Sequence, residues 1–500
     1  MADYDAIIIG AGLGGLSAGA ILARNNRRVL VLEQSDLVGG CCSTFTHYGY
    51  MFDMGASIVM ALGTMEKVFN KLGTRLEEEV ELINCDPIYN CIFRDGSKLK
   101  VYQNIERTAD EILAISPVDK DNFFRFMERF KQFMDGGGDD FFTTPLNSFA
   151  DMARLFINRP VMAQFFPYFI KTYQDIMHQY FADERIRASM SYQAFYAGHS
   201  PDLAPGIFAL LPYLEHQGMY YPCGGMIAIP QALCRVGEHY GMEVRLKSLV
   251  TRIILDDYNQ VRGVMLADGT LITSNVVVSD INARLLYMDL IGEKNLPLMM
   301  KFGIKSYETS LSAPMVYLGL DYKPPLEAHH TLIPLSLSDM NDAYWNRYRK
   351  GSIPDQQFGL VCWPTVSDPS LAPEGHHILN LILMGPYRLK DADWDDEKPR
   401  FIDKSIKLLD DLVIPGVAEH VKVKEMASPL DYERKLRLPE GAIYGLQEDL
   451  PAQAVFRPAS KSKFFKGLYL AGASTHPGGG VPTTMGSGMI AAEQVLRYEP

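Results

Sequence analysis

The first 33 residues constrain the fold of this 500-residue chain more than any other segment. Residues 4–10 form a short apolar run that ends in glycine, as a buried parallel strand does. Residues 10–15 then follow the pattern G-x-G-x-x-G, residues 17–25 favour a helix with small residues on one face, and residues 28–33 form a second strand-like run that ends in an acid. Strand, glycine turn, helix, strand and acid in this order predict a βαβ unit that binds a dinucleotide.

Each residue type in this unit has a physical role. Gly10 permits the tight turn, Gly12 lets a pyrophosphate approach the backbone, and Gly15 lets the helix pack closely on the strand. The free N–H groups at the start of the helix attract phosphate. Glu33 can accept hydrogen bonds from ribose hydroxyls and would repel a 2′-phosphate. Leu13, Gly14 and Gln34 complete the expected binding residues of this segment.

Composition narrows the class of protein. Sixty acidic residues against 48 basic ones give a net charge of −12, which argues against a nucleic-acid partner because such proteins carry basic surfaces. The longest apolar stretches, such as residues 161–170, are too short to span a bilayer. The seven cysteines show no zinc-like spacing, so no metal site is expected. Their odd number, and a strand that begins at residue 4, favour reduced thiols and a cytoplasmic protein.

Glycine-rich segments recur after the acidic strand and near the far end of the chain. Residues 38–44 and 48–58 follow Glu33 closely and extend the site toward a larger, buried cofactor. Residues 468–471 predict a strand, and residues 478–480 let the backbone pass close to a flat ring. Residues 486–495 are the expected terminal helix, whose first N–H groups would face the cofactor.

These segments resemble the FAD-dependent phytoene desaturase family, which includes carotenoid desaturases, carotenoid cis–trans isomerases and retinol saturases. That family lies within the amine-oxidase-like flavoproteins. The resemblance is most specific in residues 38–58 and 467–482 and is looser between them. Residues 221–226 resemble the family's YPxGG element, and residues 368–376 and 438–445 resemble segments of its substrate region.

The resemblance implies an FAD cofactor and an α/β fold, with a Rossmann-like FAD-binding domain of the GR2 type and an inserted α+β substrate domain. Val250 would hold the adenine side. Many relatives place Arg where this chain has Cys41, so the expected site lacks a fixed cation there. The further residues that the resemblance assigns to FAD are Gly40, Cys41, Cys42, Ser43, Gly55, Ala56, Ser57, Ile58, Gly472, Ala473, Gly480, Val481, Pro482 and Met485.

The chain is too long for one ordinary core, and its cofactor motifs lie at both ends. We therefore expect a discontinuous FAD-binding domain formed by residues 1–60, 215–290 and 455–500. Within it, residues 246–254, 261–266 and 271–278 are expected strands. Residues 61–214 and 291–454 form the expected substrate domain.

The expected substrate domain is rich in large apolar side chains. Part of the chain's 24 Met, 25 Phe and 26 Tyr is concentrated in residues 148–181, which favour helices. This region could be ordinary core, could line an apolar tunnel, or could rest on lipid with Arg154, Arg159 and Lys171 toward the headgroups. Met and aromatic side chains suit an irregular apolar guest. We therefore expect a long lipid or polyene as substrate and a peripheral contact with a membrane.

Histidines are the candidate proton-transfer groups. His476 lies in the C-terminal motif and could relay a proton, or only cap its loop. His199 lies between expected substrate helices and could line the pocket. His329 and His330 are expected to be exposed in a loop.

The sequence is compatible with four functions. The first is a flavin-dependent redox enzyme that removes or adds hydride at C–C bonds of a long apolar chain. The second is a flavin-dependent cis–trans isomerase of polyenes. The third is a flavin-free lipid escort protein, which the intact glycine turn and Glu33 disfavour. The fourth is an amine oxidase, which would need an aromatic cage around the amine.

Overall fold

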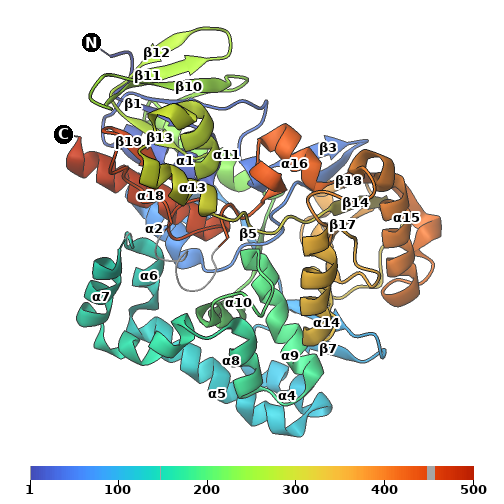
Figure 1. Cartoon of the computed structure of the whole chain (residues 1–500). Coiled ribbons are helices and arrows are strands. Elements are labelled where there is room, and N and C mark those ends of the chain that lie inside the picture. The colour runs from blue at the N-terminus through green and yellow to red at the C-terminus, as the bar shows by residue number, and fades with distance from the viewer. Residues whose placement is uncertain (1, 147, 448–456, 500) are drawn as a thin grey trace.

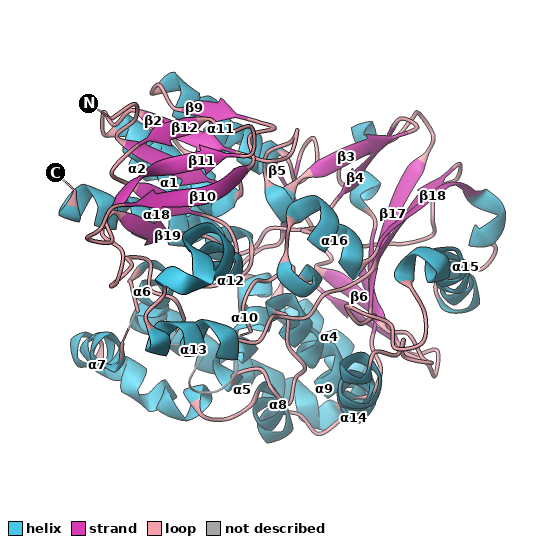
Figure 2. Cartoon of the chain, turned by 45° about the horizontal axis from the view of Figure 1, so that its top comes forward, coloured by secondary structure: helices cyan, strands magenta, loops and turns pink. Residues whose placement is uncertain are grey.

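The structure of the chain is a computed structural model that describes residues 2–146, 148–447 and 457–499 (Figure 1). The expected domain boundary at residues 454–455 lies outside the described residues. Two large sheets stand apart, with a helical layer below them (Figures 1 and 2). The first sheet carries the glycine turn, and the second bounds the inserted region.

A five-stranded parallel sheet gathers strands from distant parts of the chain. Its order is β19 (Leu468–Leu470), β13 (Val277–Ser279), β1 (Ala6–Ile9), β2 (Val29–Leu32) and β9 (Glu243–Arg245). Because β1, β2, β13 and β19 are fully buried, both faces of the sheet must be covered there, while the edge strand β9 is partly exposed. On one face, α1 (Leu13–Arg24) packs against α11 (Ala228–His239) and α18 (Val481–Tyr498). On the other face lies a three-stranded antiparallel sheet.

The antiparallel sheet consists of β10 (Val250–Leu255), β11 (Val261–Leu266) and β12 (Leu271–Thr273). The single strand expected over residues 271–278 is therefore wrong, since β12 and β13 belong to different sheets. Ser274 explains the break: its hydroxyl accepts a hydrogen bond from the Val276 N–H at 3.1 Å and donates to the Val276 carbonyl at 2.9 Å. Such local bonds favour a turn over a continuous strand.

The terminal helix α18 is longer than expected and begins at Val481 rather than at residue 486. Pro482 is compatible with this start because proline fits the first turn of a helix. Gly488 lowers helix propensity, but it is needed for packing: a Cβ there would lie 2.1 Å from the Gly14 carbonyl oxygen of α1. Close approach of α1 and α18 thus overrides local propensity.

A seven-stranded mixed sheet forms the second centre. Its order is β18 (Val421–Ala427), β14 (Met315–Leu320), β17 (His377–Leu383), β16 (Gly359–Cys362), β15 (His330–Ile333), β6 (Tyr89–Ile92) and β7 (Lys98–Val101). One face packs against α15 (Trp394–Leu412). The other face looks toward the helical layer and the first sheet. There are also two separate two-stranded antiparallel sheets: β3 (Thr44–His47) pairs with β4 (Tyr50–Asp53) in a hairpin, and β5 (Leu82–Asn84) pairs with the distant β8 (Tyr220–Pro222).

The helical layer confirms the helical expectation for residues 148–181, with a 3-10 stretch in the middle. Its members include α4 (Ile105–Ile115), α5 (Pro117–Phe133), α6 (Asp139–Thr143), α7 (Phe149–Asn158), η3 (Pro160–Phe169), α8 (Tyr173–Tyr180), α9 (Glu184–Ser191) and α10 (Leu211–His216). The shorter helices elsewhere are α2 (Leu62–Leu72), α3 (Leu76–Glu79), α12 (Ala283–Leu285), α13 (Leu298–Ser306), α14 (Leu337–Asp342) and α16 (Pro429–Leu436). No helix in the described part of the chain is long and apolar enough to cross a bilayer.

Candidate cofactor and substrate site

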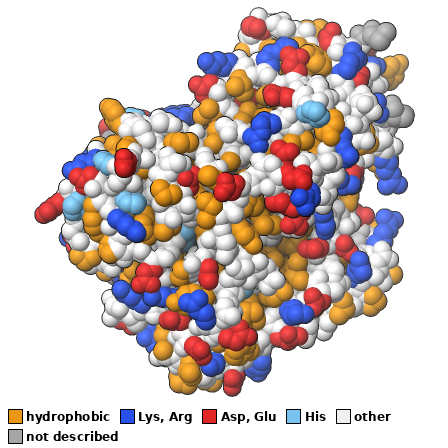
Figure 3. All heavy atoms as spheres, turned by 180° about the vertical axis from the view of Figure 1, so that it is seen from behind, with side chains coloured by type: hydrophobic (Ala, Val, Ile, Leu, Met, Phe, Trp, Pro, Cys, Tyr) orange, Lys and Arg blue, Asp and Glu red, His pale blue; other side chains and the backbone are white. Residues whose placement is uncertain are grey.

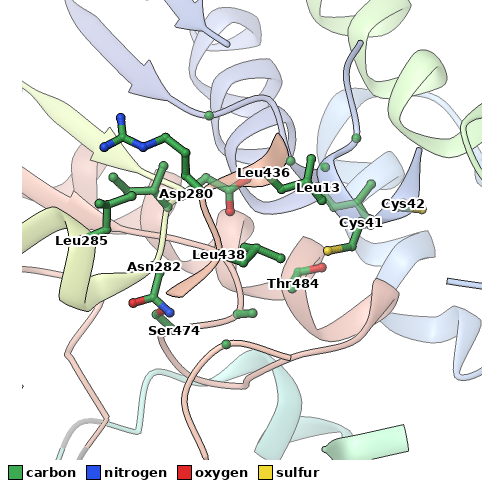
Figure 4. A pocket seen from close by; sticks show the side chains of 18 of the residues that line it. Leu13, Cys41, Cys42, Asp280, Asn282, Leu285, Leu436, Leu438, Ser474 and Thr484 are labelled. Atoms are coloured by element: carbon green, nitrogen blue, oxygen red, sulfur yellow. The ribbon is translucent and has the colours of Figure 1, made fainter. Parts of the chain in front are cut away.

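An elongated cavity of about 260 Å³ lies at the carboxyl ends of the parallel strands, where doubly wound sheets bind their ligands. The ends of β1, β2 and β13 supply Gly10, Glu33 and Asp280 to its wall. Figure 4 shows Cys41 and Thr484 at one end of the view, Asn282 and Leu285 at the other, and Asp280 beside Leu13 between them.

The start of α1 faces this cavity with its backbone. Gly10 has φ +97°, a conformation that favours glycine and makes the sharp turn from β1. Gly12 is the N-cap and has no side chain to cap the helix. The Gly12 and Gly15 backbone hydrogen-bonds Asp280, and the Leu13 and Gly14 N–H groups between them stay available to an anion. A Cβ on Gly15 would lie 2.2 Å from the Gly10 carbonyl oxygen, which explains why only glycine fits.

Glu33 stands at the end of β2 and is buried. Its Oε2 accepts a hydrogen bond from the Ala11 N–H at 2.8 Å, and its Oε1 accepts from the Ser35 N–H at 2.9 Å. These bonds hold the carboxyl group on the cavity wall. Oε1 also accepts from the Ser35 hydroxyl at 2.9 Å, so Oε2 is the oxygen with a second acceptor position for a ribose hydroxyl.

Asp280 places a second carboxyl group directly against the glycine turn. A Cβ on Gly12 would meet its Oδ2 at 2.4 Å, and one on Gly472 would meet its Oδ1 at 2.2 Å. Burial raises the pKa of Asp280 to about 7, the negative charge of Glu33 adds to the rise, and hydrogen bonds from the Gly15 and Gly12 backbone oppose it. Near neutral pH this carboxyl group is therefore close to its titration midpoint.

Another wall of the cavity is a segment that we name the strap. It comprises residues 436–445 and begins at the last residue of α16. Leu436, Arg437, Leu438, Ala442, Ile443, Tyr444 and Gly445 of the strap line the cavity. Residues 438–445 were expected to lie in the substrate region; the structure places them against the cofactor cavity as well. Arg437 has φ +54° and is the only Lys or Arg among the described lining residues of this cavity.

A second cavity of about 550 Å³ adjoins the first. Gly55, Ala56, Ile443, Tyr444, Gly480 and Val481 line both cavities. The second cavity is bounded by aromatic and aliphatic side chains of α5, α6, α10 and the seven-stranded sheet, such as Phe133, Phe142 and Leu360. The charged residues of its lining, Glu66 and Asp139, are exposed to solvent. Tyr444 and His330 are among the uncharged polar residues of the lining. The interior is thus apolar with few polar groups.

The residues present fit a flavin dinucleotide. Two helix N-termini, of α1 after Gly12 and of α18 after Gly480, open to the cavity, and neither N-cap glycine supplies a capping side chain. A Cβ on Gly40 would point into open space, so the backbone there leaves room for a ligand. Burial raises the pKa of the Cys41 thiol to about 12, so this thiol stays protonated and adds no negative charge to the site.

The structure brings most of the expected FAD residues to these cavities. Lining the first are Gly10, Gly12, Leu13, Glu33, Gln34, Gly40, Cys41, Cys42, Gly55, Ala56, Val250, Ala473, Gly480 and Val481. Ser57, Ile58 and Pro482 line the second. Gly14, Gly15, Ser43, Gly472 and Met485 line neither among the described residues. Gly14 and Gly472 pack against each other instead, since a Cβ on Gly14 would lie 2.5 Å from the Gly472 N.

Sequence reasoning missed Asp280 and Arg437. Asp280 had a signal, because it directly follows a strand whose carboxyl end meets the glycine turn. Arg437 had none, since it comes to the cavity from a segment assigned to the substrate region. The seven cysteines are all free thiols, as expected, and Cys41 and Cys42 form no disulfide.

The histidines differ from expectation. His329 and His330 are buried, not exposed, and His330 begins β15. His199 is buried but is not among the described residues that line either cavity. His476 also lies outside both linings, and its Nε2 is 2.7 Å from the Phe141 carbonyl oxygen. This contact is the loop-capping alternative for His476, and its catalytic role stays a prediction.

A parallel sheet with this turn, this acid and two open helix N-termini defines a dinucleotide-binding oxidoreductase fold. The sequence profile of flavin containing amine oxidoreductases matches residues 13–496. The chain therefore belongs to this family, and it is a flavin-dependent oxidoreductase.

Similar proteins span nearly the whole chain. A zeta-carotene-forming phytoene desaturase of Myxococcus xanthus is 29% identical over 98% of this chain and 94% of its own length. A phytoene desaturase of Fusarium fujikuroi is 30% identical over 98% of this chain and 89% of its own length. Among solved structures, an oxidoreductase from Methanosarcina mazei has a TM-score of 0.64 at 16% identity and covers 98% of this chain and 99% of its own, which supports the fold.

Proposed function

We propose that the protein is an FAD-dependent desaturase that removes hydrogen from C–C bonds of a long polyene of the phytoene type. The apolar 550 Å³ cavity that joins the cofactor cavity at Gly55 and Ala56 carries the proposal. A bound flavin supplies a two-electron acceptor for hydride. The relatives named as phytoene desaturases favour desaturation over the isomerase and escort alternatives.

FAD fits the cofactor cavity better than a mononucleotide. The cavity meets the second cavity at Gly55 and Ala56. It also includes Glu33, Gln34 and Val250, which the second cavity does not. A flavin without the adenosine half would leave these residues without a ligand. Glu33 then binds the ribose of the adenosine, and the backbone at Gly12 faces the pyrophosphate.

The chain's own contribution to the chemistry is position and exclusion of water. Aromatic side chains such as Phe142, Tyr192 and Phe195 line the second cavity and would hold an extended apolar chain against the junction. Tyr444 lies at the junction itself, and burial raises the pKa of its hydroxyl far above the usual range, so it stays a neutral hydrogen-bond donor.

Purification tests both parts of this proposal. The released cofactor should co-elute with FAD and not with FMN in chromatography. Organic extraction followed by mass spectrometry should find a polyene or another long isoprenoid. A colourless protein that also fails to take up added FAD, or one that carries FMN, would contradict the proposal.

We also propose that the protein collects this substrate from a membrane surface through an apolar patch on α7 and η3. Ile157, Val161, Phe166 and Ile170 are exposed, with Ile157 at 74%. Arg154, Arg159 and Lys171 flank them and would meet lipid phosphates. Phe169 of the same segment packs on Phe141 of the cavity wall, with ring centroids 5.7 Å apart. On the face shown in Figure 3, acidic and basic side chains are interspersed and apolar ones gather in a hollow.

Vesicle sedimentation tests this contact. The protein should co-sediment with phosphatidylcholine–phosphatidylglycerol vesicles, and the double variant Ile157→Ser, Phe166→Ser should stay largely in the supernatant. Leu271→Ser is the matched control. Leu271 is exposed to a similar degree, 50%, but it lies on β12 of the three-stranded antiparallel sheet, far from η3 in the sequence. Equal sedimentation of the double variant and the wild type would contradict this contact.

A further inference from the structure

Ser57 and His330 meet at the wall of the apolar cavity. The His330 Nε2 lies 3.1 Å from the Ser57 Oγ, and both residues line the cavity. Ser57 directly follows Ala56, which lines both cavities, so the pair stands next to the junction where a cofactor ring and a substrate chain would meet. Among the described residues that line either cavity, His330 is the only histidine.

The backbone of Ser57 is fixed by the neighbouring histidine. The His329 Nε2 lies 3.2 Å from the Ser57 carbonyl oxygen, and the His329 Nδ1 lies 3.0 Å from the Ser367 Oγ. A carbonyl oxygen only accepts, so Nε2 of His329 must carry the proton and its Nδ1 must accept from Ser367. His329 is therefore a positioning residue that holds Ser57 in place.

His330 belongs to a polar row across one sheet face. In the register of β15, β16 and β17, His330 is opposite Cys362, and Cys362 is opposite Asn380. Partners in register point to the same face, which here bounds the cavity and is otherwise apolar. All three are buried, and in the described part of the chain the His330 Nδ1 and both amide atoms of Asn380 have no hydrogen-bond partner. Buried polar atoms without partners reduce stability, so their retention needs a reason.

From this geometry we propose that Ser57 and His330 form a proton relay that takes the proton released when the substrate is desaturated. The relay deepens the proposed desaturase function and rests on it. A bound oxidised flavin would accept a hydride from one substrate carbon. The C–H bond of the neighbouring carbon then breaks, its electron pair becomes the new π bond, and its proton goes to the Ser57 Oγ as the Ser57 hydroxyl proton passes to the His330 Nε2.

The electrostatic state of His330 suits this task. Burial, and next the neighbouring His329, hold the pKa of His330 well below its ordinary value, so the ring is neutral and can accept a proton. A weak base is sufficient, because a carbon beside one that has lost hydride becomes strongly acidic. The thiol of Cys362 also approaches Ser57, and burial raises the pKa of this thiol to about 12, so it does not compete as a base.

The test is single-turnover reduction of the flavin by phytoene in phosphatidylcholine vesicles, without oxygen, in the full-length holoprotein. His330→Gln and Ser57→Ala should each slow flavin reduction by about 10²–10⁴-fold, the usual worth of a proton-transfer group. Thr331→Val is the matched control, since Thr331 is equally buried on β15 but faces the opposite side of the sheet. It should react at the wild-type rate.

Three readouts separate a relay from a structural role. The amount of FAD bound per protein and the affinity for phytoene should be unchanged in His330→Gln and in Ser57→Ala. Imidazole should restore activity to His330→Ala. The wild type should show a solvent deuterium isotope effect that Ser57→Ala lacks.

A folded His330→Gln that reduces its flavin as fast as the wild type would overturn the relay. If this variant does not fold, Ser57→Ala alone decides, because it deletes one oxygen and leaves β15 intact. A wild type whose flavin phytoene does not reduce would instead overturn the proposed function, so the two failures are distinguishable.

Discussion

At the scale of single residues, Asp280 is the least expected feature of the cofactor site. A carboxylate beside a pyrophosphate would repel it, and hydrogen bonds from the backbone of Gly15 and Gly12 stabilise this carboxylate. Cys41, where many relatives carry Arg, brings no compensating charge. Burial is the main cause that raises the pKa of Asp280 to about 7, so we expect its protonation to affect how well the site accepts phosphate.

FAD affinity should consequently depend on pH. As pH rises through about 7, Asp280 ionises and the dissociation constant for FAD should increase by up to about tenfold per pH unit. In Asp280→Asn this dependence should vanish, and binding above pH 7 should be tighter than in the wild type. Flavin fluorescence titrations from pH 5.5 to 8.5 measure this, with Asp36→Asn as the exposed control. A wild-type affinity that does not change with pH would refute the role given to Asp280.

A second prediction concerns Glu215 and the dependence of folding stability on pH. It is fully buried, its Oε2 accepts from the Gln193 Nε2 at 2.9 Å, and burial raises its pKa from 4.5 to about 8. The folded state therefore holds a proton that the unfolded state releases, so this group's contribution to stability falls as pH rises from about 4.5 to 8.

In Glu215→Gln that loss should be absent. The free energy of unfolding of the variant, relative to the wild type, should rise by about 1 kcal/mol per pH unit over this window. Urea unfolding at pH 5, 6.5 and 8 gives the difference. A constant difference across these three pH values would show that Glu215 does not titrate as described.

At the scale of elements, the strap and α18 close the cofactor cavity from two sides. Sequence reasoning predicted the strand before α18 and the body of the helix, but not its first turn from Val481, where Pro482 and two threonines are poor helix formers. It found residues 438–445 as a family segment but placed them only with the substrate, since nothing local indicates which cavity a loop will line.

Gly441 tests the strap. It has φ +63°, and a Cβ there would lie 2.3 Å from the Pro429 carbonyl oxygen, so Gly441→Ala should displace the strap and loosen bound FAD. Gly375→Ala is the matched control: φ is +74° but nothing lies within 4 Å. Both variants should lose about 1 kcal/mol of stability for the left-handed backbone, and only Gly441→Ala should lose FAD on dialysis. Equal retention of FAD by both would contradict the role of the strap.

At the scale of the whole molecule, the nucleotide-binding unit was predictable and the substrate site was not. The order of strand, glycine turn, helix and acid is local in sequence, so the pattern specifies it. His330 and Ser57 are 273 residues apart and meet only because β15 pairs with β16 and β6 in the second sheet. The histidine pair at 329–330 gives no local sign of burial until that pairing is known.

We propose that the two joined cavities carry out flavin-dependent desaturation of a polyene. The most direct test mixes the purified holoprotein with phytoene in vesicles without oxygen and follows the flavin absorbance together with the products. We expect stoichiometric bleaching, with one new double bond formed per flavin reduced. Geometric isomers without net oxidation, or no spectral change with any polyene, would contradict it.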